Sequence, residues 1–351
     1  MISSSNGHTA KRLTASCLGI LTLLVPATIF ARDTSVPGHM NIFTPSSTPA
    51  LQISHLAILV FLITGAIFLF VAILLGYVIF RYRARGEESM EPPQVYGSNQ
   101  IELAWTVIPV LIVIVLFLAT ARVIFAVQDP VKPRSALDVT VIGHQFWWEF
   151  RYPKFGIVTA NELHVPVSSA SHPAPTYLKL MSADVDHSFW VPQLAGKTDL
   201  IPNRVNEMWV DPLHTGLYLG QCAQFCGVEH AKMLLRVYVD TPEQFAEWTR
   251  NQQQPGRQDS RAALGRQIFE TQSCMNCHTI QGTAATGRFG PDLTHLMSRA
   301  TIAAGVTMNN RTNLVDWIKN PDHIKKGSLM PAMQLSDDQI DVVVAYLSTL
   351  Q

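Results

Sequence analysis

The sequence predicts a multi-domain membrane protein made of a two-helix transmembrane hairpin, a β-sandwich or β-barrel, and a small helical module. Two long uncharged apolar runs predict the hairpin. Short segments rich in β-branched and aromatic residues predict the β domain. Helical periodicity around a Cys-x-x-Cys-His motif predicts the C-terminal module.

The composition agrees with a chain of several domains that lies partly in lipid. Its 351 residues are enough for more than one domain. Only 15% of them are charged, and the mean hydropathy is +0.16. The 26 basic and 26 acidic residues balance, so charge does not favour a nucleic-acid partner.

The N-terminal segment resembles a secretory signal peptide. Lys11 and Arg12 precede an apolar run, Cys17–Phe30, which is followed by an alanine suited to cleavage. A third membrane helix is the alternative, although Pro26 interrupts a run that is short for a membrane span. We expect residues 1–31 to be a signal peptide, which leaves two close pairs of cysteines in the mature protein.

The apolar runs Leu56–Phe80 and Leu103–Ala121 contain no charged residue. At about 1.5 Å per residue, each is long enough to cross a hydrocarbon core of about 30 Å. Pro109 lies near the start of the second run and is tolerated where neighbouring helices satisfy the freed carbonyl. We expect a transmembrane hairpin over residues 53–128.

The charges around the two spans favour one orientation only weakly. The connection between them carries Arg81, Arg83 and Arg85, which favours a cytoplasmic loop. Basic residues also follow the second span, so the bias is small. The orientation of the hairpin therefore has to be inferred from the compartment in which the domains that follow it function.

A β domain is expected over residues 135–250. Between Leu137 and Asp240, segments such as LDVTVIG, TYLKLMS, NEMWVD and LLRVYVD are separated by Pro, Gly, Asn and Asp. This pattern is typical of an antiparallel β-sandwich or barrel of about 100 residues. The segment TPEQFAEWTR predicts a short helix, and residues 251–261 form a polar linker without apolar periodicity.

A small, mostly helical module is expected over residues 262–351. It begins with an amphipathic helix, Ala262–Thr271, and ends in DDQIDVVVAYLSTL, where apolar residues recur at helical spacing.

The module contains Cys274, Cys277 and His278 in the sequence CMNCH, the attachment signature of c-type haem. Two thiols on one helical turn can reach the two vinyl groups of a haem, and the adjacent imidazole can ligate the iron. A thioredoxin-like redox pair would lack the following histidine, and a zinc site would need further ligands. We therefore expect covalently attached haem c.

The other iron ligand should be a soft side chain. The module offers four candidate methionines: Met297, Met308, Met330 and Met333. The segments GPDL and GSLMPAM resemble loops of the small cytochromes c that are fused to oxidases. This resemblance implies Met330, the methionine that precedes proline, with Met333 as the alternative.

Residues 220–234, GQCAQFCGVEHAKML, bring Cys222, Cys226, His230 and Met233 close in sequence. A disulfide would leave the histidine and methionine unexplained, and zinc rarely recruits methionine. Thiolate, imidazole and thioether ligands together favour copper. The β domain offers four candidates for a second imidazole: His144, His164, His187 and His214.

Four segments resemble subunit II of the haem–copper cytochrome c oxidases. They are NQIELAWTVIP at the second span, GHQFWWEFRYP at the first strand, SADVDHSFWVP and GQCAQFCGVEHAKM, and the similarity covers roughly residues 53–249. The resemblance implies a dinuclear copper centre, CuA, on a cupredoxin-like β-barrel, followed by an all-α cytochrome c module. It implies these ligands: Cys222 and Cys226 bridging both coppers, His187 and His230 each terminating one, and Met233 and the backbone carbonyl of Gln224 as weak axial ligands.

Two positions depart from the family pattern. Gln224 stands where the family usually has a glutamate that helps to hold Mg²⁺, so we do not expect magnesium. Phe146 stands where the family commonly has tryptophan, followed here by Trp147 and Trp148. In the family this aromatic cluster receives electrons from a separate cytochrome c. Because this chain has its own haem module, as caa-type oxidases do, we hypothesise that the tethered haem replaces or supplements that donor.

The resemblance implies an oxidoreductase subunit that carries electrons from cytochrome c, its own module or an external donor, through CuA to subunit I. There dioxygen is reduced to water with proton translocation. It further implies subunits I and III as partners, and a bacterial plasma membrane with both termini and both redox domains on the periplasmic face. The family's counterpart of Glu102 lies near the mouth of a proton channel. Asp184 and Asp186 either form a docking surface for a basic partner or are simply solvated.

Two alternative functions stay open at this point. A CuA-bearing subunit of a nitric oxide reductase would differ in its catalytic partner. A non-catalytic copper-binding membrane protein would carry no haem. Quinol oxidase subunit II shares the fold but lacks the copper ligands present here.

Overall fold

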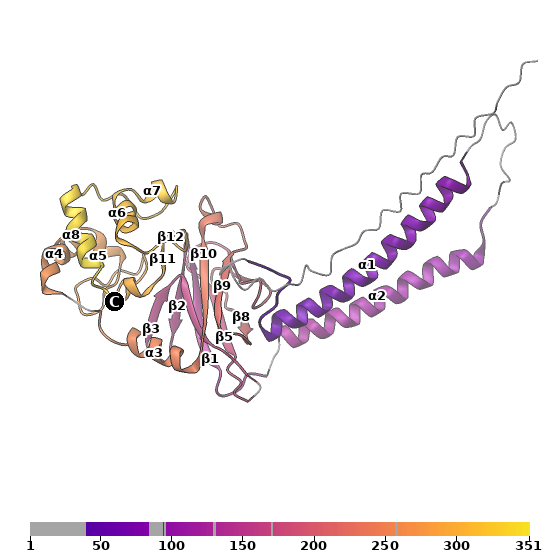
Figure 1. Ribbon diagram of the computed structural model, residues 1–351, viewed down its shortest axis with the longest axis horizontal. Helices are drawn as coiled ribbons and strands as arrows, with labels where there is room; N and C mark the ends of the chain where they lie inside the picture. Colours follow the sequence, from indigo (N-terminus) through magenta and orange to yellow (C-terminus); the bar gives the residue numbers. More distant parts are fainter. Residues whose placement is uncertain (1–39, 84–93, 95, 129–130, 170, 257–258) are drawn as a thin grey trace, which may run out of the picture. The chain divides into compact units, whose positions relative to one another are not determined.

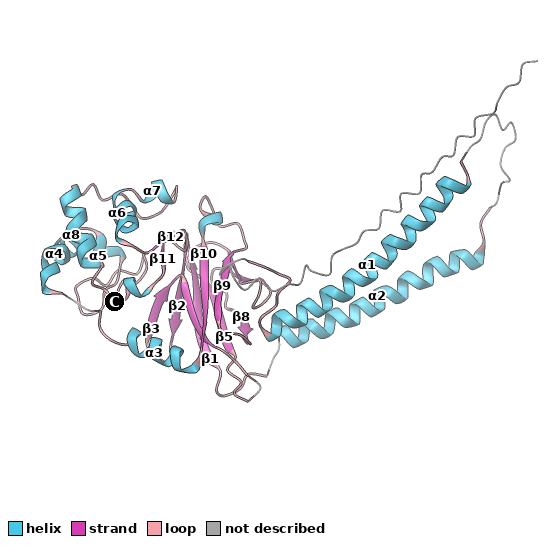
Figure 2. Ribbon diagram, viewed as in Figure 1, coloured by secondary structure: helices cyan, strands magenta, loops and turns pink. Residues whose placement is uncertain are grey.

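The computed structural model of the chain contains helices and strands in the order that the sequence predicts (Figures 1 and 2). It describes residues 40–83, 94, 96–128, 131–169, 171–256 and 259–351. The predicted signal peptide, residues 1–31, lies outside the described residues.

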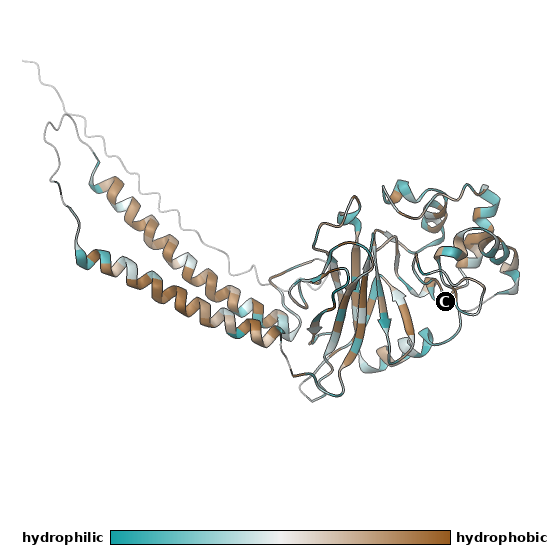
Figure 3. Ribbon diagram, turned by 180° about the vertical axis from the view of Figure 1, so that it is seen from behind, coloured by the Kyte–Doolittle hydropathy of each residue, from teal (hydrophilic) through white to brown (hydrophobic). Residues whose placement is uncertain are grey.

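Helices α1 (Thr48–Arg81) and α2 (Asn99–Gln128) are both long and apolar enough to cross a membrane. Apolar residues colour most of their length in Figure 3, and the two helices contact each other. Most of their side chains are exposed in the protein alone, as expected for helices whose apolar surface faces lipid.

The outer ends of the hairpin are tied to the β domain. The hydroxyl of Thr48 donates to the carboxylate of Asp211 at 2.5 Å. The indole N–H of Trp209 donates to the carbonyl of Val127 at 2.7 Å. The start of α1 and the end of α2 therefore lie on the same side, next to the β domain.

The β domain consists of two five-stranded sheets. The first has the order β3 (Ile157–Ala160), β2 (Trp147–Tyr152), β1 (Leu137–His144), β5 (Thr176–Ser182), β8 (Asn206–Val210). The second has the order β4 (Glu162–Pro166), β10 (Leu234–Asp240), β9 (Gly216–Cys222), β6 (His187–Trp190), β7 (Thr198–Leu200).

The prediction of an antiparallel domain is wrong for two strand pairs. β1 pairs with β5 in parallel, and β4 pairs with β10 in parallel. Each pair joins strands that are distant in sequence, so a long connection replaces the hairpin that an antiparallel pair requires. The amphipathic pattern of a strand does not report the direction of its neighbour.

One apolar core lies between the two sheets. Strand β10 shows the period-2 burial of a strand with one inward face, since Leu235, Val237 and Val239 are buried and their neighbours are partly exposed. Trp148 and Phe189 are fully buried and meet edge to face, with ring centroids 5.6 Å apart. This core also contains both cysteines of the predicted copper loop.

The C-terminal part is mainly helical. Helix α3 (Pro242–Gln252) follows the sheets and starts with a capping box formed by Thr241 and Gln244. The remaining elements are η3 (Ser260–Ala262), α4 (Ala263–Thr271), α5 (Cys274–Cys277), η4 (Leu296–Ser298), β11 (Thr301–Ile302), β12 (Thr307–Met308), α6 (Arg311–Lys319), α7 (Pro321–Ile324) and α8 (Asp337–Leu347). The helices expected at both ends of the module are confirmed as α4 and α8.

Helices α4 and α8 pack closely because Gly265 has no side chain. A Cβ atom at this position would lie 2.0 Å from the carbonyl oxygen of Val342. The apolar faces of the two helices form a second core, separate from the core of the sheets.

Candidate metal and haem sites

Strand pairing brings the distant parts of the copper loop together. Cys222 is the last residue of β9, and His187 is the first residue of β6. Because β6 and β9 are neighbours in the sheet, with Phe189 opposite Cys222, the histidine lies beside the cysteine although 35 positions separate them. The loop then returns through the short helix η2 (His230–Lys232) to β10.

The five side chains predicted as copper ligands form one cluster, in which His230 is half-buried and the other four are buried. The Sγ atom of Cys222 lies 3.9 Å from Nδ1 of His187 and 3.9 Å from Sγ of Cys226. The Sγ atom of Cys226 lies 3.6 Å from Nδ1 of His230 and 3.8 Å from Sδ of Met233. A disulfide has an S–S length of about 2.05 Å, so both thiols are free.

Gln224 presents its backbone and not its side chain to the cluster. Its carbonyl oxygen lies 3.2 Å from Sγ of Cys222, whereas the residue itself is exposed.

The other candidate histidines lie elsewhere. His144 stacks on Trp147 with ring centroids 4.2 Å apart. His164 bonds to the carboxylate of Asp240 at 2.8 Å, and His214 is exposed. Of the four, His187 is the one that joins the cysteines.

Asp184 orients His187. Its carboxylate lies 2.8 Å from Nε2 of His187 and accepts backbone N–H bonds from Gln145 and Val185 at 2.7 Å each. Although partial burial opposes it, these hydrogen bonds lower the pKa of Asp184, so the group is a carboxylate at neutral pH. When Nε2 carries the proton that it shares with Asp184, Nδ1 presents its lone pair to the cysteines.

Gly143 provides the space for this imidazole. A Cβ atom on Gly143 would lie 2.7 Å from Cδ2 of His187, which is fully buried. The sequence analysis missed this role and that of Asp184. The spacing of Asp184 three residues before the histidine was the available signal.

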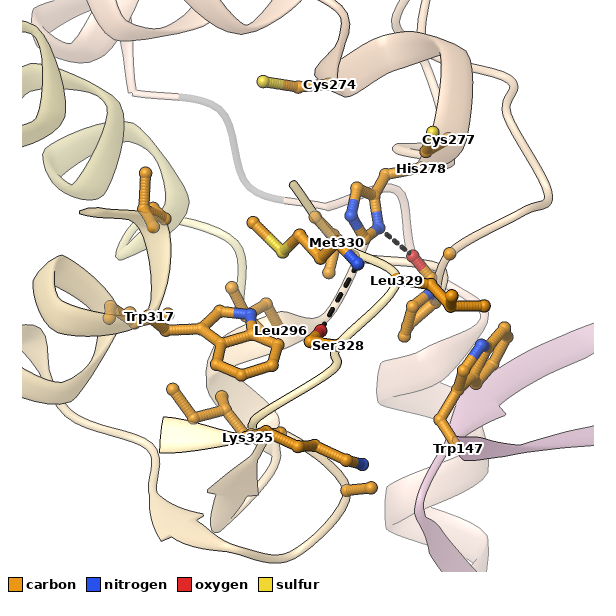
Figure 4. Close-up of a pocket in the computed structure, with 18 of the residues that line it drawn as sticks. Trp147, Cys274, Cys277, His278, Leu296, Trp317, Lys325, Ser328, Leu329 and Met330 are labelled. Atoms are coloured by element: carbon orange, nitrogen blue, oxygen red, sulfur yellow. Dashed lines mark hydrogen bonds between the residues drawn. The ribbon is translucent and has the colours of Figure 1, made fainter. Parts of the chain in front are cut away.

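A second site is a largely apolar pocket that the helical module forms together with residues of the β domain (Figure 4). Cys274, Cys277, His278 and Met330 line it, as the sequence predicts. Its lining is mostly apolar and it opens to solvent, which suits a large planar apolar ligand with a polar edge.

His278 is held with one ring nitrogen engaged. Its Nδ1 atom lies 2.8 Å from the carbonyl oxygen of Pro291, which leaves Nε2 free for a metal. Burial lowers the pKa of His278 and therefore favours the neutral imidazole that ligates iron. Gly290 packs against the ring, since a Cβ atom there would lie 2.6 Å from Cε1.

Two of the four candidate methionines belong to this pocket. Met330 and Met333 both line it. Met308 is 56% exposed, and Met297 packs against the core of the module. The structure therefore narrows the choice of the second iron ligand to Met330, which the resemblance implies, and Met333, its alternative.

Arg299 is a further pocket residue that the sequence analysis missed. Its guanidinium is buried and donates one N–H to the carbonyl of Asp292 at 2.6 Å. Its Nε atom has no hydrogen-bond partner among the described residues. An unpaired buried donor in this wall suits an acidic group of the bound ligand.

The predicted aromatic residues lie between the two sites. Phe146 and Trp147 are more than nine-tenths buried and line the haem pocket from the β domain. Trp148 is fully buried, with its ring centroid 6.1 Å from that of His187. Glu102 is distant from both sites in the chain and lies exposed in the first turn of α2.

Comparison with known proteins finds a matching family for the hairpin, for the β domain and for the helical module. Residues 35–123 match the family described as Cytochrome C oxidase subunit II, transmembrane domain, and residues 161–239 match its periplasmic domain. Residues 262–351 match Cytochrome c. The cytochrome c oxidase subunit 2 of Alkalihalophilus pseudofirmus is 31% identical over 321 residues, which cover 89% of this chain and 91% of the relative. The chain belongs to the cytochrome c oxidase subunit 2 family.

A second relative agrees with this assignment. The cytochrome c oxidase subunit 2 of Bacillus sp. strain PS3 is 34% identical over 289 residues, which cover 77% of this chain and 79% of the relative. As a member of the cytochrome c oxidase subunit 2 family, the protein is the electron-transfer subunit of an oxidoreductase complex. It carries CuA and haem c, and it works with the catalytic subunit I.

The residues of this cytochrome c oxidase subunit 2 fit both groups. The copper cluster supplies sulfur and imidazole donors, which are ligands that copper prefers. These donors lie at the apolar core of the β domain. The hydrogen bond between the thiols lowers the pKa of Cys222 although burial opposes it, and the same bond with burial raises the pKa of Cys226. The lowered pKa of Cys222 favours one thiolate in the pair, and bound copper would favour deprotonation of Cys226 as well.

Replacing Asp184 with asparagine should weaken copper binding by about ten- to hundredfold. Removing the carboxylate that is hydrogen-bonded to a metal-ligating histidine typically lowers the metal affinity by this factor. The matched control is Asp186→Asn at an exposed neighbour, which should bind copper normally. Competition with a chelator measures both affinities. Equal losses in the two variants would assign the effect to surface charge and contradict the orienting role of Asp184.

Proposed function

We propose that the ligands of CuA in this chain are His187, Cys222, the carbonyl of Gln224, Cys226, His230 and Met233. The observation that carries the proposal is the cluster of His187, Cys222 and Cys226, whose ligand atoms all lie within 4.8 Å of one another. Its sulfur atoms are buried, so the protein excludes water from the site. When bound, CuA and haem c each accept and release single electrons and leave substrate bonds unchanged.

The same reasoning assigns the haem site. We infer that Cys274 and Cys277 attach haem c, and that His278 and Met330 ligate the iron. The short helix α5 holds both thiols on one turn, and the bond between His278 and Pro291 fixes the orientation of the imidazole. Met333 remains the alternative ligand because it lines the same pocket.

We also infer that electrons pass from the haem module to the copper domain near Phe146 and Trp147. Their burial in the wall of the haem pocket supports this, since little of either ring is accessible to a separate protein. The tethered module then replaces or supplements the soluble donor at this face.

The remaining assignments concern the membrane. We propose a bacterial plasma membrane with both chain termini and both redox domains on the periplasmic face, and with subunit III as a further partner. The bonds of Thr48 and Trp209 support this topology, because they place both outer ends of the hairpin beside the β domain. Glu102 then lies at the inner end of α2, where we propose a proton path into subunit I begins.

Metal and haem analysis of the purified full chain tests these assignments. We expect two coppers and one covalently bound haem c per chain, with the absorption bands of both groups. A chain without copper, or with haem that organic solvent extracts, would contradict the proposed ligands. Oxygen uptake is expected only when subunit I is present.

A further inference from the structure

Polar contacts join the haem module to the copper domain near the haem pocket. The buried carboxylate of Glu162 accepts hydrogen bonds from the backbone N–H of Ala300 at 3.1 Å and of Thr301 at 2.9 Å. In the other direction, Nζ of Lys232 donates to the carbonyl of Ile324 at 2.9 Å. Each domain therefore satisfies polar groups of the other, and the two are packed together as well as linked.

Lys325 is a further buried group at this contact. It belongs to the haem module, directly after α7, and only 4% of it is exposed. Its Nζ atom donates to the carbonyl of Phe146, in the copper domain, at 2.6 Å. Figure 4 shows it at the edge of the pocket that also holds Trp147.

Burying a lysine is unfavourable unless its amino group is paired or hydrogen-bonded. Burial lowers the pKa of Lys325 to about 7, although the carboxylate of Glu229 in the copper loop opposes this shift. Both the amine and the ammonium can donate to a carbonyl, so the contact with Phe146 holds in either protonation state. Lys326, the next residue, is exposed.

The segment that Lys325 holds is also bonded to the copper site. The side-chain amide of Gln145 donates to the carbonyl of Cys226 at 2.6 Å. The backbone N–H of Gln145 donates to Asp184, the partner of His187. Both Gln145 and Phe146 line the haem pocket. This dipeptide therefore connects the pocket wall to the copper loop through a few hydrogen bonds.

We propose that Lys325 is a positioning residue. Its hydrogen bond to Phe146 keeps the haem module packed against the copper domain, and it keeps Gln145–Phe146 in place between the haem pocket and the copper loop. This proposal rests on the proposed function of the two sites. In the electron transfer that this arrangement supports, ferrous haem c loses one electron and becomes ferric, and the oxidised copper pair gains that electron. No bond is made or broken, and no proton moves.

Lys325→Met tests this role, because methionine fills a similar volume but has no N–H to donate. The full chain loaded with copper and haem is compared with the matched control Lys326→Met. We expect Lys325→Met to speed proteolysis of the segment between α3 and η3 several-fold and to slow haem-to-copper transfer after flash photoreduction several-fold. Lys326→Met should match the native chain. Native proteolysis and a native transfer rate in Lys325→Met would overturn the proposal.

Amine labelling of the native chain provides a test that needs no variant. With a soluble acylating reagent, Lys326 should react rapidly and Lys325 at least tenfold more slowly. Equal labelling rates would show that the interface opens freely and would overturn the proposal, even where Lys325→Met fails to load its cofactors. Failure of the proposed function has a different signature, namely missing copper or haem in the native chain.

Discussion

Replacing Cys226 with serine is expected to abolish the copper centre and reduce oxygen uptake by the assembled oxidase to background. Cys226 lies within 4 Å of Cys222, His230 and Met233, so it occupies the middle of the cluster. A serine hydroxyl is a hard, neutral ligand and would not replace the soft thiolate that copper prefers. Copper analysis, the visible spectrum and oxygen uptake measure the loss.

Cys274→Ser is the crossed control for this prediction. It should retain both coppers and impair covalent haem attachment, whereas Cys226→Ser should retain haem and lose copper. The two cysteines lie in separate cores, so neither change should unfold the other domain. Loss of both cofactors in Cys226→Ser would indicate a general folding defect, and retained copper would contradict the ligand assignment.

Replacing Met330 with histidine is expected to lower the reduction potential of haem c by a few tenths of a volt. Axial ligands set haem potentials over about 0.8 V, and a thioether favours the reduced iron more than an imidazole does. Met330 and His278 line the same pocket, so a substituted imidazole at position 330 remains within the haem site. Potentiometric titration of the haem absorption band measures the shift.

Met333→His is the matched control, because Met333 lines the same pocket three residues later. It should leave the potential close to that of the native chain. A large fall in Met333→His with little change in Met330→His would reverse the assignment and make Met333 the iron ligand.

The elements whose signal is local in sequence could be predicted. The uncharged runs that became α1 and α2, and the apolar periodicity of α8, each report the environment of a single element. The proposed haem attachment residues lie on one turn of α5, so their spacing alone was enough to predict them. Parallel pairing of β1 with β5 could not be predicted, because neither strand encodes which partner lies beside it.

The sequence by itself determined the membrane hairpin, and it predicted the haem attachment motif and four candidate copper ligands in residues 220–234, because each depends on short-range spacing. Its resemblance to a known family was needed to choose His187 and Met330 from four candidates each. Only the tertiary structure showed that the pairing of β6 with β9 carries His187 to Cys222, that Asp184 orients it, and that Lys325 reaches Phe146 from another domain. These contacts join residues through strand register and domain packing, which short-range spacing does not encode.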